Sequence, residues 1–169
     1  MPEYQFLGET NAVPYDAFGH VVMRRFIDVA DLILHPEKLA LAASPNTPLT
    51  TFPGFVSGAI LNVFHVPAGF CGHSGGVYIE SADSTQPSAT IAMGDGDHTA
   101  GWMAAVALSD PSWQGTIPAD AYGSASYDNY GYIVADTIDI LHAVQPTIDA
   151  KYHVYMMGVK AFDLLGADV

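Results

Sequence analysis

The sequence predicts an all-β fold, either an antiparallel β-sandwich or a jelly-roll-like barrel, with an extended N-terminal arm. Two observations support this prediction. Several short runs alternate apolar and polar residues or are rich in β-branched residues, and clusters of Gly, Pro, Ser and Asp separate them. The chain has 169 residues, enough for one domain with a buried core. We therefore expect an arm at residues 1–19 and a single β-sandwich domain at residues 20–169.

Six segments have the composition or the alternation of strands. Helical spacing of apolar residues also occurs at residues 21–34, but the β-branched start of this stretch favours a strand. Residues 35–58 contain four prolines and are expected to form a long connection. Gly158 lies within the last segment and is expected to mark a bulge. The expected strands are residues 20–28, 59–66, 76–80, 88–93, 136–141 and 152–165.

The strand at residues 136–141 alternates most clearly. Ile138 and Ile140 are expected to face the core, and Thr137 and Asp139 are expected to face outward. An acidic substitution at either isoleucine should therefore prevent folding.

The arm at residues 1–19 is apolar without periodicity, and Pro2, Gly8, Pro14 and Gly19 interrupt it. Its apolar side chains would be costly to leave in water, so it must pack along its own domain or onto another chain. Assembly through a sheet edge or groove favours a neighbouring subunit as the partner. Its expected interface residues are Tyr4, Phe6, Leu7, Tyr15 and Phe18.

The charge of the chain is strongly acidic, with a formal net charge of −13. Residues 39–150 contain ten acidic residues and no Lys or Arg, so this surface should repel nucleic acid and anionic membranes. Four of the five cations, all but Lys38, lie in or beside the first and last expected strands. Those two strands could lie together and face an acidic partner.

Charged residues make up only 14% of the chain, whereas a typical soluble domain has about 25%. Either some surface is hidden in contacts with other chains, or the surface is neutral and rich in Ser, Thr, Asn and Gly. The N-terminus resembles no signal peptide, and no stretch approaches the ~20 apolar residues that span a bilayer. We therefore expect synthesis in a host cytoplasm.

The stretch around Ser74 matches G-x-S-x-G literally, from Gly72 to Gly76. That nucleophile motif requires a strand-to-helix turn, whereas an expected strand follows here. The G-x-S-G-G motif of chymotrypsin-like proteases carries an Asp where this chain has His73. We therefore expect no catalytic residue, and we expect the glycines to form a bend with positive φ.

The spacing of Cys, His and Asp residues gives only weak indications of a metal site. Cys71 and His73 lie two positions apart, but the chain has no second cysteine for a structural zinc site or an intrachain disulfide. Asp95 and Asp97 have the alternate spacing of calcium ligands, but no later Glu completes an EF-hand loop. They are weak calcium candidates beside the alternative of a simple Asp-Gly turn, and no cofactor is expected.

Residues 121–133 form a segment rich in Tyr, Ser, Gly and Asn, a mixture typical of binding loops. The segment could also pack onto its own sandwich. A further alternative is a carbohydrate- or calcium-binding module in which these tyrosines, with Trp102 or Trp113, form a stacking platform. The expected interface residues of the segment are Tyr122, Tyr127 and Tyr130.

The order of several short motifs resembles small β-rich virion proteins of tailed bacteriophages. Each motif alone is common, and their order along residues 20–165 carries the resemblance. The motifs are RFIDVADL (25–32), VPAG (66–69), GVYIESAD (76–83), a strand ending in GDGD (91–97) with Gly101-Trp102, ADTIDI (135–140), and the apolar strand at 154–165.

The resemblance implies a non-enzymatic virion component on the outer surface of the head. A capsid decoration (cement) protein, as a homotrimer bound to the major capsid protein, is the leading expectation. A tail or head-fibre component is the alternative. The arm and the long segment between residues 34 and 59 depart from the pattern.

Overall fold

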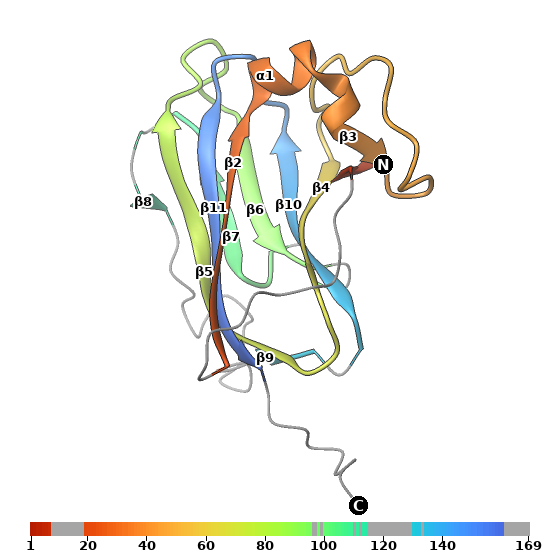
Figure 1. Cartoon of the computed structure of the whole chain (residues 1–169). Coiled ribbons are helices and arrows are strands. Elements are labelled where there is room, and N and C mark those ends of the chain that lie inside the picture. Colours follow the sequence, from red (N-terminus) through yellow and green to blue (C-terminus); the bar gives the residue numbers. More distant parts are fainter. Residues whose placement is uncertain are drawn as a thin grey trace, which may run out of the picture.

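The computed structural model of the chain is shown in Figure 1. It describes residues 1–7, 19–95, 98, 100–109, 111, 113–114, 130–132 and 134–160. Its elements in chain order are β1 (Glu3–Phe6), β2 (His20–Asp28), α1 (Val29–Leu34), the 3₁₀ helix η1 (Pro36–Lys38), β3 (Leu39–Leu41), β4 (Ala59–Val66), β5 (Phe70–Ser81), β6 (Thr90–Gly94), β7 (Met103–Ala107), β8 (Trp113–Gln114), β9 (Tyr130–Gly131), β10 (Asp136–Val144) and β11 (Lys151–Lys160).

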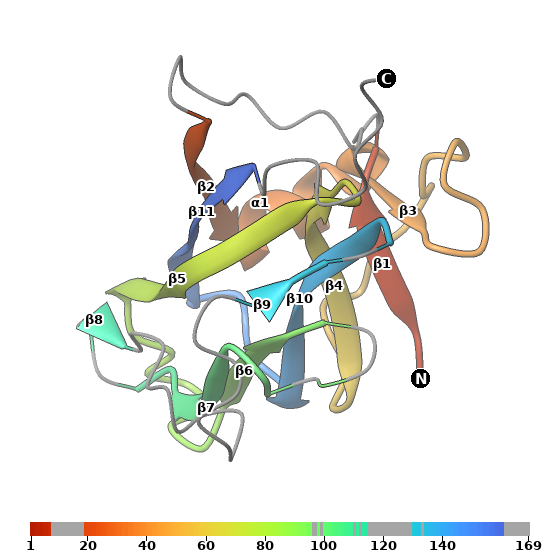
Figure 2. The same cartoon turned by 90° about the horizontal axis from the view of Figure 1, so that it is seen from below.

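Within the described residues, the strands form two sheets that pack against each other as a sandwich (Figure 2). The six-stranded sheet has the order β3-β1-β4-β10-β6-β7. The five-stranded sheet has the order β2-β11-β5-β8, and β9 also pairs with β5. The strand pairs are antiparallel except for β1 and β4, which run parallel. The predicted all-β sandwich is confirmed.

The core lies between the sheets and follows the alternation of the strands. Ile27 and Val154 face inward from β2 and β11, and Leu61 and Ile140 face inward from β4 and β10. All four side chains are fully buried. Burying such side chains contributes about 1.5–3 kcal/mol each, which is the main stabilising term of the fold.

The strands with strong local patterns lie where the sequence predicts them. Strands β2 and β4 have the predicted bounds, and both Ile138 and Ile140 are buried as expected. The pairing of β11 with β5 shifts register between Met157 and Gly158, but the extra residue is His73 on β5, so the predicted bulge at Gly158 is wrong and the irregularity lies opposite it. Strands β2 and β11 pair antiparallel, so the two cation-bearing strands do lie side by side.

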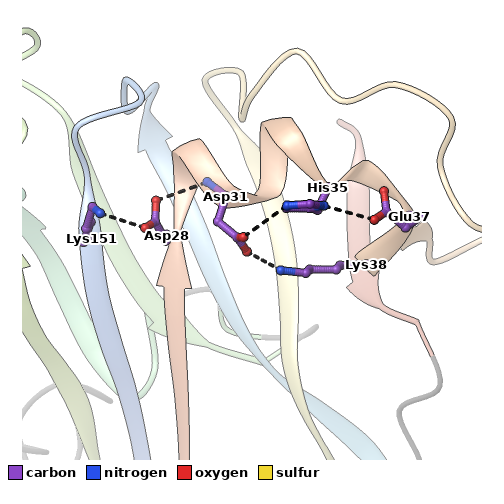
Figure 3. A network of polar contacts seen from close by, with 6 residues as sticks. All are labelled: Asp28, Asp31, His35, Glu37, Lys38 and Lys151. Atoms are coloured by element: carbon purple, nitrogen blue, oxygen red, sulfur yellow. Dashed lines mark hydrogen bonds and ion pairs between the residues drawn. The ribbon is translucent and has the colours of Figure 1, made fainter.

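The strand prediction for residues 21–34 is right only as far as Asp28, because helix α1 follows. The Asp28 side chain caps this helix by accepting a hydrogen bond from the Asp31 N–H at 3.2 Å. Lys151 pairs with Asp28 at 2.8 Å, and Lys38 pairs with Asp31 at 2.6 Å. Figure 3 shows both ion pairs at the two ends of the helical segment. Burial alone would raise the pKa of Asp28, but the hydrogen bonds from Lys151 and the backbone outweigh it and lower the pKa. The cap therefore stays ionised and ties α1 to β11.

The expected N-terminal arm is wrong for residues 3–6, which form β1 inside the six-stranded sheet between β3 and β4. Tyr4 is buried and packs edge-on against Phe52 and Phe55 from the segment expected to be a plain connection. That segment also contains η1 and β3. Proline and glycine interrupt the flanking sequence without preventing a short strand, because four residues suffice to pair with β4.

The expected glycine bend around Ser74 is also wrong, because residues 70–81 form one continuous strand, β5. The left-handed turn comes earlier, at Gly69, where φ is +83°. A Cβ atom on Gly72 would lie 2.5 Å from Cη2 of the Trp102 ring and would also clash with Met156. The glycine is therefore needed for side-chain space, since Trp102 fills the core against β5.

Replacing Gly72 with alanine is expected to destabilise the fold by about 1–3 kcal/mol, because the added methyl group overpacks the core. Trp102 cannot easily retreat, since its Nε1 donates a 2.8 Å hydrogen bond to the Tyr132 hydroxyl. Gly131→Ala is the matched control, because a Cβ there meets no atom within 4 Å. Urea unfolding of both variants checks the prediction. Equal stabilities would show that Trp102 does not limit the space at Gly72.

Candidate functional site

Ser74 lies in the middle of β5, and its register partner is Met157 on β11. The strand-to-helix turn of a nucleophile elbow is not present at this position, because β5 continues to Ser81. Cys71 lies nearby on the same strand and is half-buried. Burial raises the pKa of the Cys71 thiol, which disfavours the reactive thiolate. The local geometry is that of a sheet surface.

The turn after β6 is built around the buried carboxylate of Asp95. Its Oδ1 accepts from the His98 N–H at 2.8 Å, and its Oδ2 accepts from the Tyr132 hydroxyl at 3.3 Å. Tyr132 in turn accepts from Trp102, so the turn is linked to the core by side-chain hydrogen bonds. Asp97, the second calcium candidate, lies outside the described residues. A calcium site at this turn stays a prediction.

Across the described ranges, no three His, Cys, Asp or Glu side chains gather closely enough to hold a metal ion. None of the helices described there is long and apolar enough to cross a bilayer.

The predicted interface residues fall into three groups: those in or beside β1, Tyr130, whose backbone alone is described, and those outside the described residues. Tyr4 is buried in its own core, Phe6 is half-buried beneath the Arg25 guanidinium at 4.2 Å, and Leu7 is exposed. Tyr130 begins β9, while its side chain lies outside the description. Tyr4 therefore stabilises the sandwich and is not available to a neighbouring subunit. Outside the described residues lie Tyr15, Phe18, Tyr122 and Tyr127.

Trp102, named as a possible stacking platform, is buried and cannot bind a sugar from solvent. Of Trp113, only its backbone in β8 is described.

A buried polar cluster lies on the six-stranded sheet, where Asp139 on β10 pairs in register with Asn62 on β4. The expectation that Asp139 faces solvent is wrong, because only 3% of the residue is exposed. Oδ1 of Asp139 and Oδ1 of Asn62 have no hydrogen-bond partner, while the Asn62 amide donates to Glu3 at 3.0 Å. Burial raises the pKa of Asp139 to about 7, and the charges of Glu3, Asp136 and Asp95 add to this rise.

A second buried polar group joins the two sheets. His142 stacks on Phe55 with ring centroids 3.8 Å apart, and its Nε2 lies 2.8 Å from the Tyr152 hydroxyl. Burial lowers the pKa of His142 to about 3, so the ring is neutral at physiological pH. Burial also raises the pKa of Tyr152. These groups are enclosed in the core, which suits a structural role.

The surface feature that sequence reasoning missed is the outer face of β2, β11 and β5. In an antiparallel sandwich this face is usually polar. Here Val22, Phe26, Tyr78 and Met157 are exposed on it by between 41% and 64%. The signal was present in the sequence, because the run at residues 20–28 has apolar residues on both faces, with Val22 and Phe26 on the outer one.

Comparison with known proteins identifies a likeness in fold. No protein-family description matches the sequence, and no curated protein matches it. A chain in the structure titled "Capsid of Ralstonia phage GP4" matches this fold with a TM-score of 0.60 at 11% sequence identity. The match covers 94% of this chain and 97% of that chain. The two chains therefore share an architecture over nearly their whole lengths.

Proposed function

We propose that this chain is a non-enzymatic structural protein of a bacteriophage virion, a decoration subunit on the outer surface of the head shell. The observation that carries the proposal is the full-length likeness in fold to a chain of a phage capsid. Because both chains are covered almost completely, the likeness concerns a protein of similar size and not one shared module.

The order of motifs along residues 20–165 supports the same role independently, because it was identified from the sequence alone. The net charge of −13 favours the outside of the shell, since packaged DNA repels an acidic protein. The exposed apolar face of β2, β11 and β5 supports assembly with other subunits. The partners in this proposal are the major capsid protein and further copies of the chain.

Co-sedimentation with shells assembled from the major capsid protein of the encoding phage tests the proposal. We expect saturable binding that persists in about 0.5 M salt, where charge–charge attraction is strongly screened. Shells already saturated with unlabelled chain are the control for specific binding. A chain that stays in the supernatant would contradict the decoration role, and complete release at moderate salt would contradict apolar binding.

A further inference from the structure

A row of buried polar side chains crosses the six-stranded sheet, from β1 through β4 to β10 (Figure 2). Gln5 pairs in register with Asn62, and Asn62 pairs in register with Asp139. Each of the three residues is exposed by 7% or less. Proteins almost never bury an aspartate fully unless its charge is paired, so the charge of Asp139 requires a partner.

Two oxygen atoms in this row are available to such a partner. The Asn62 amide nitrogen donates to Oε1 of Glu3 at 3.0 Å, which leaves Oδ1 of Asn62 as an acceptor. Oδ1 of Asn62 and Oδ1 of Asp139 are both buried, and neither has a hydrogen-bond partner in the part of the chain that the structure describes. Directly opposite residues of an antiparallel pair have Cβ atoms about 4.5–5.5 Å apart. The two oxygens therefore belong to neighbouring side chains, and one ligand can serve both.

The charge around the row is negative. The carboxylates of Glu3, Asp136 and Asp95 act on Asp139 and oppose its ionisation. Residues 39–150 contain no Lys or Arg that would balance these charges. A proton on Asp139, or a water molecule between the two oxygens, would supply hydrogen bonds but would leave the other carboxylates uncompensated. A metal cation satisfies both oxygens and also offsets the surrounding charge.

We propose that Asp139 and Asn62 bind a calcium ion through their Oδ1 atoms, beside Glu3. Calcium takes oxygen ligands from carboxylates and amides in flexible geometry, whereas magnesium demands a near-ideal octahedron. The site needs no third His, Cys, Asp or Glu ligand, because water fills the remaining positions. Glu3 is exposed, so the ion can enter from solvent.

The bound ion joins β4 to β10 in the middle of the six-stranded sheet, so it stabilises the folded state. Because the protein supplies few ligands, we expect a dissociation constant of about 0.1–1 mM. The inference goes beyond the proposed function and does not rest on it, since calcium binding is measured without shells.

Thermal unfolding of the calcium-free chain at pH 8 tests the inference. About 10 mM calcium chloride should raise the melting temperature of the wild-type chain by about 3 °C or more, relative to sodium chloride of equal ionic strength. Asp139→Asn keeps the shape of the side chain but removes its charge, so this variant should lose the rise relative to its own melting temperature in chelator. Titration calorimetry should find one calcium ion fewer per variant chain than per wild-type chain.

Two further variants are matched controls, because each also removes one acidic group. Glu37→Gln lies at an exposed position on η1, and Asp97→Asn removes a calcium candidate indicated by the sequence. Both variants should keep the full rise. The inference would be overturned by the absence of any rise beyond the sodium control, by a rise that survives Asp139→Asn, or by a rise that depends on Asp97.

Discussion

A chain that lacks residues 2–7 is expected to lose its cooperative unfolding transition. Strand β1 lies between β3 and β4, so its removal leaves the hydrogen-bonding edge of β4 open and separates β3 from the sheet. It also removes Tyr4 from its contacts with Phe52 and Phe55. These losses are comparable to the whole stability of a domain, about 5–15 kcal/mol. Circular dichroism during thermal unfolding measures the result.

Two point variants separate the core contact from the rest of the segment. Tyr4→Ala should cost about 3–5 kcal/mol, the range for truncating a large buried aromatic side chain. Leu7→Ala should cost much less, because Leu7 is 40% exposed. If the truncated chain unfolds at the wild-type temperature, β1 does not belong to the fold and the N-terminal segment is an arm after all.

Asp139→Asn is expected to stabilise the protein above pH 7 by a few kcal/mol. Burial raises the pKa of Asp139 to about 7, whereas the ordinary value of an aspartate is 3.8. Between these values the folded state binds a proton that the unfolded state has released, so stability falls as the pH rises from about 4 to about 7. The asparagine keeps the shape of the side chain without a charge and should remove this fall.

Melting temperatures at pH 8 and pH 4.5 check the prediction. The gain should be about 5 °C or more at pH 8 and much smaller at pH 4.5. Glu37→Gln is the control for net charge, because it also removes one acidic group, but at an exposed position on η1. An equal gain in the control, or no gain at pH 8, would show that Asp139 does not carry a buried charge.

The neighbourhood of Asp139 also shows why alternation alone misled the sequence prediction. The pattern at residues 136–141 correctly separates Ile138 and Ile140 from their neighbours. It cannot reveal that β10 is a central strand, flanked by β4 and β6. The pairing of β10 with β4 shifts register between Ile138 and Asp139, and Asp139 lies between Asn62 on β4 and Gly94 on β6, where its side chain is buried although the alternation assigns it to solvent.

The glycine-rich run from Gly72 to Gly76 is a second case. Glycine is required both where φ is positive and where another group comes close, and a sequence does not distinguish the two reasons. Gly69 is an example of the first and Gly72 of the second. Only the position of Trp102, thirty residues later in the chain, decides between them.

The sequence by itself determined the all-β class, the bounds of β2 and β4, the burial of Ile138 and Ile140 and the acidic charge of the chain. These properties depend on local composition and on the two-residue period of a strand, which any reader of the chain can count. Only the tertiary structure decided that residues 3–6 pair inside a sheet and that β2 lies beside β11 and β5. Strand order is set by contacts between residues far apart in the chain, so the apolar outer face forms only when those three strands come together.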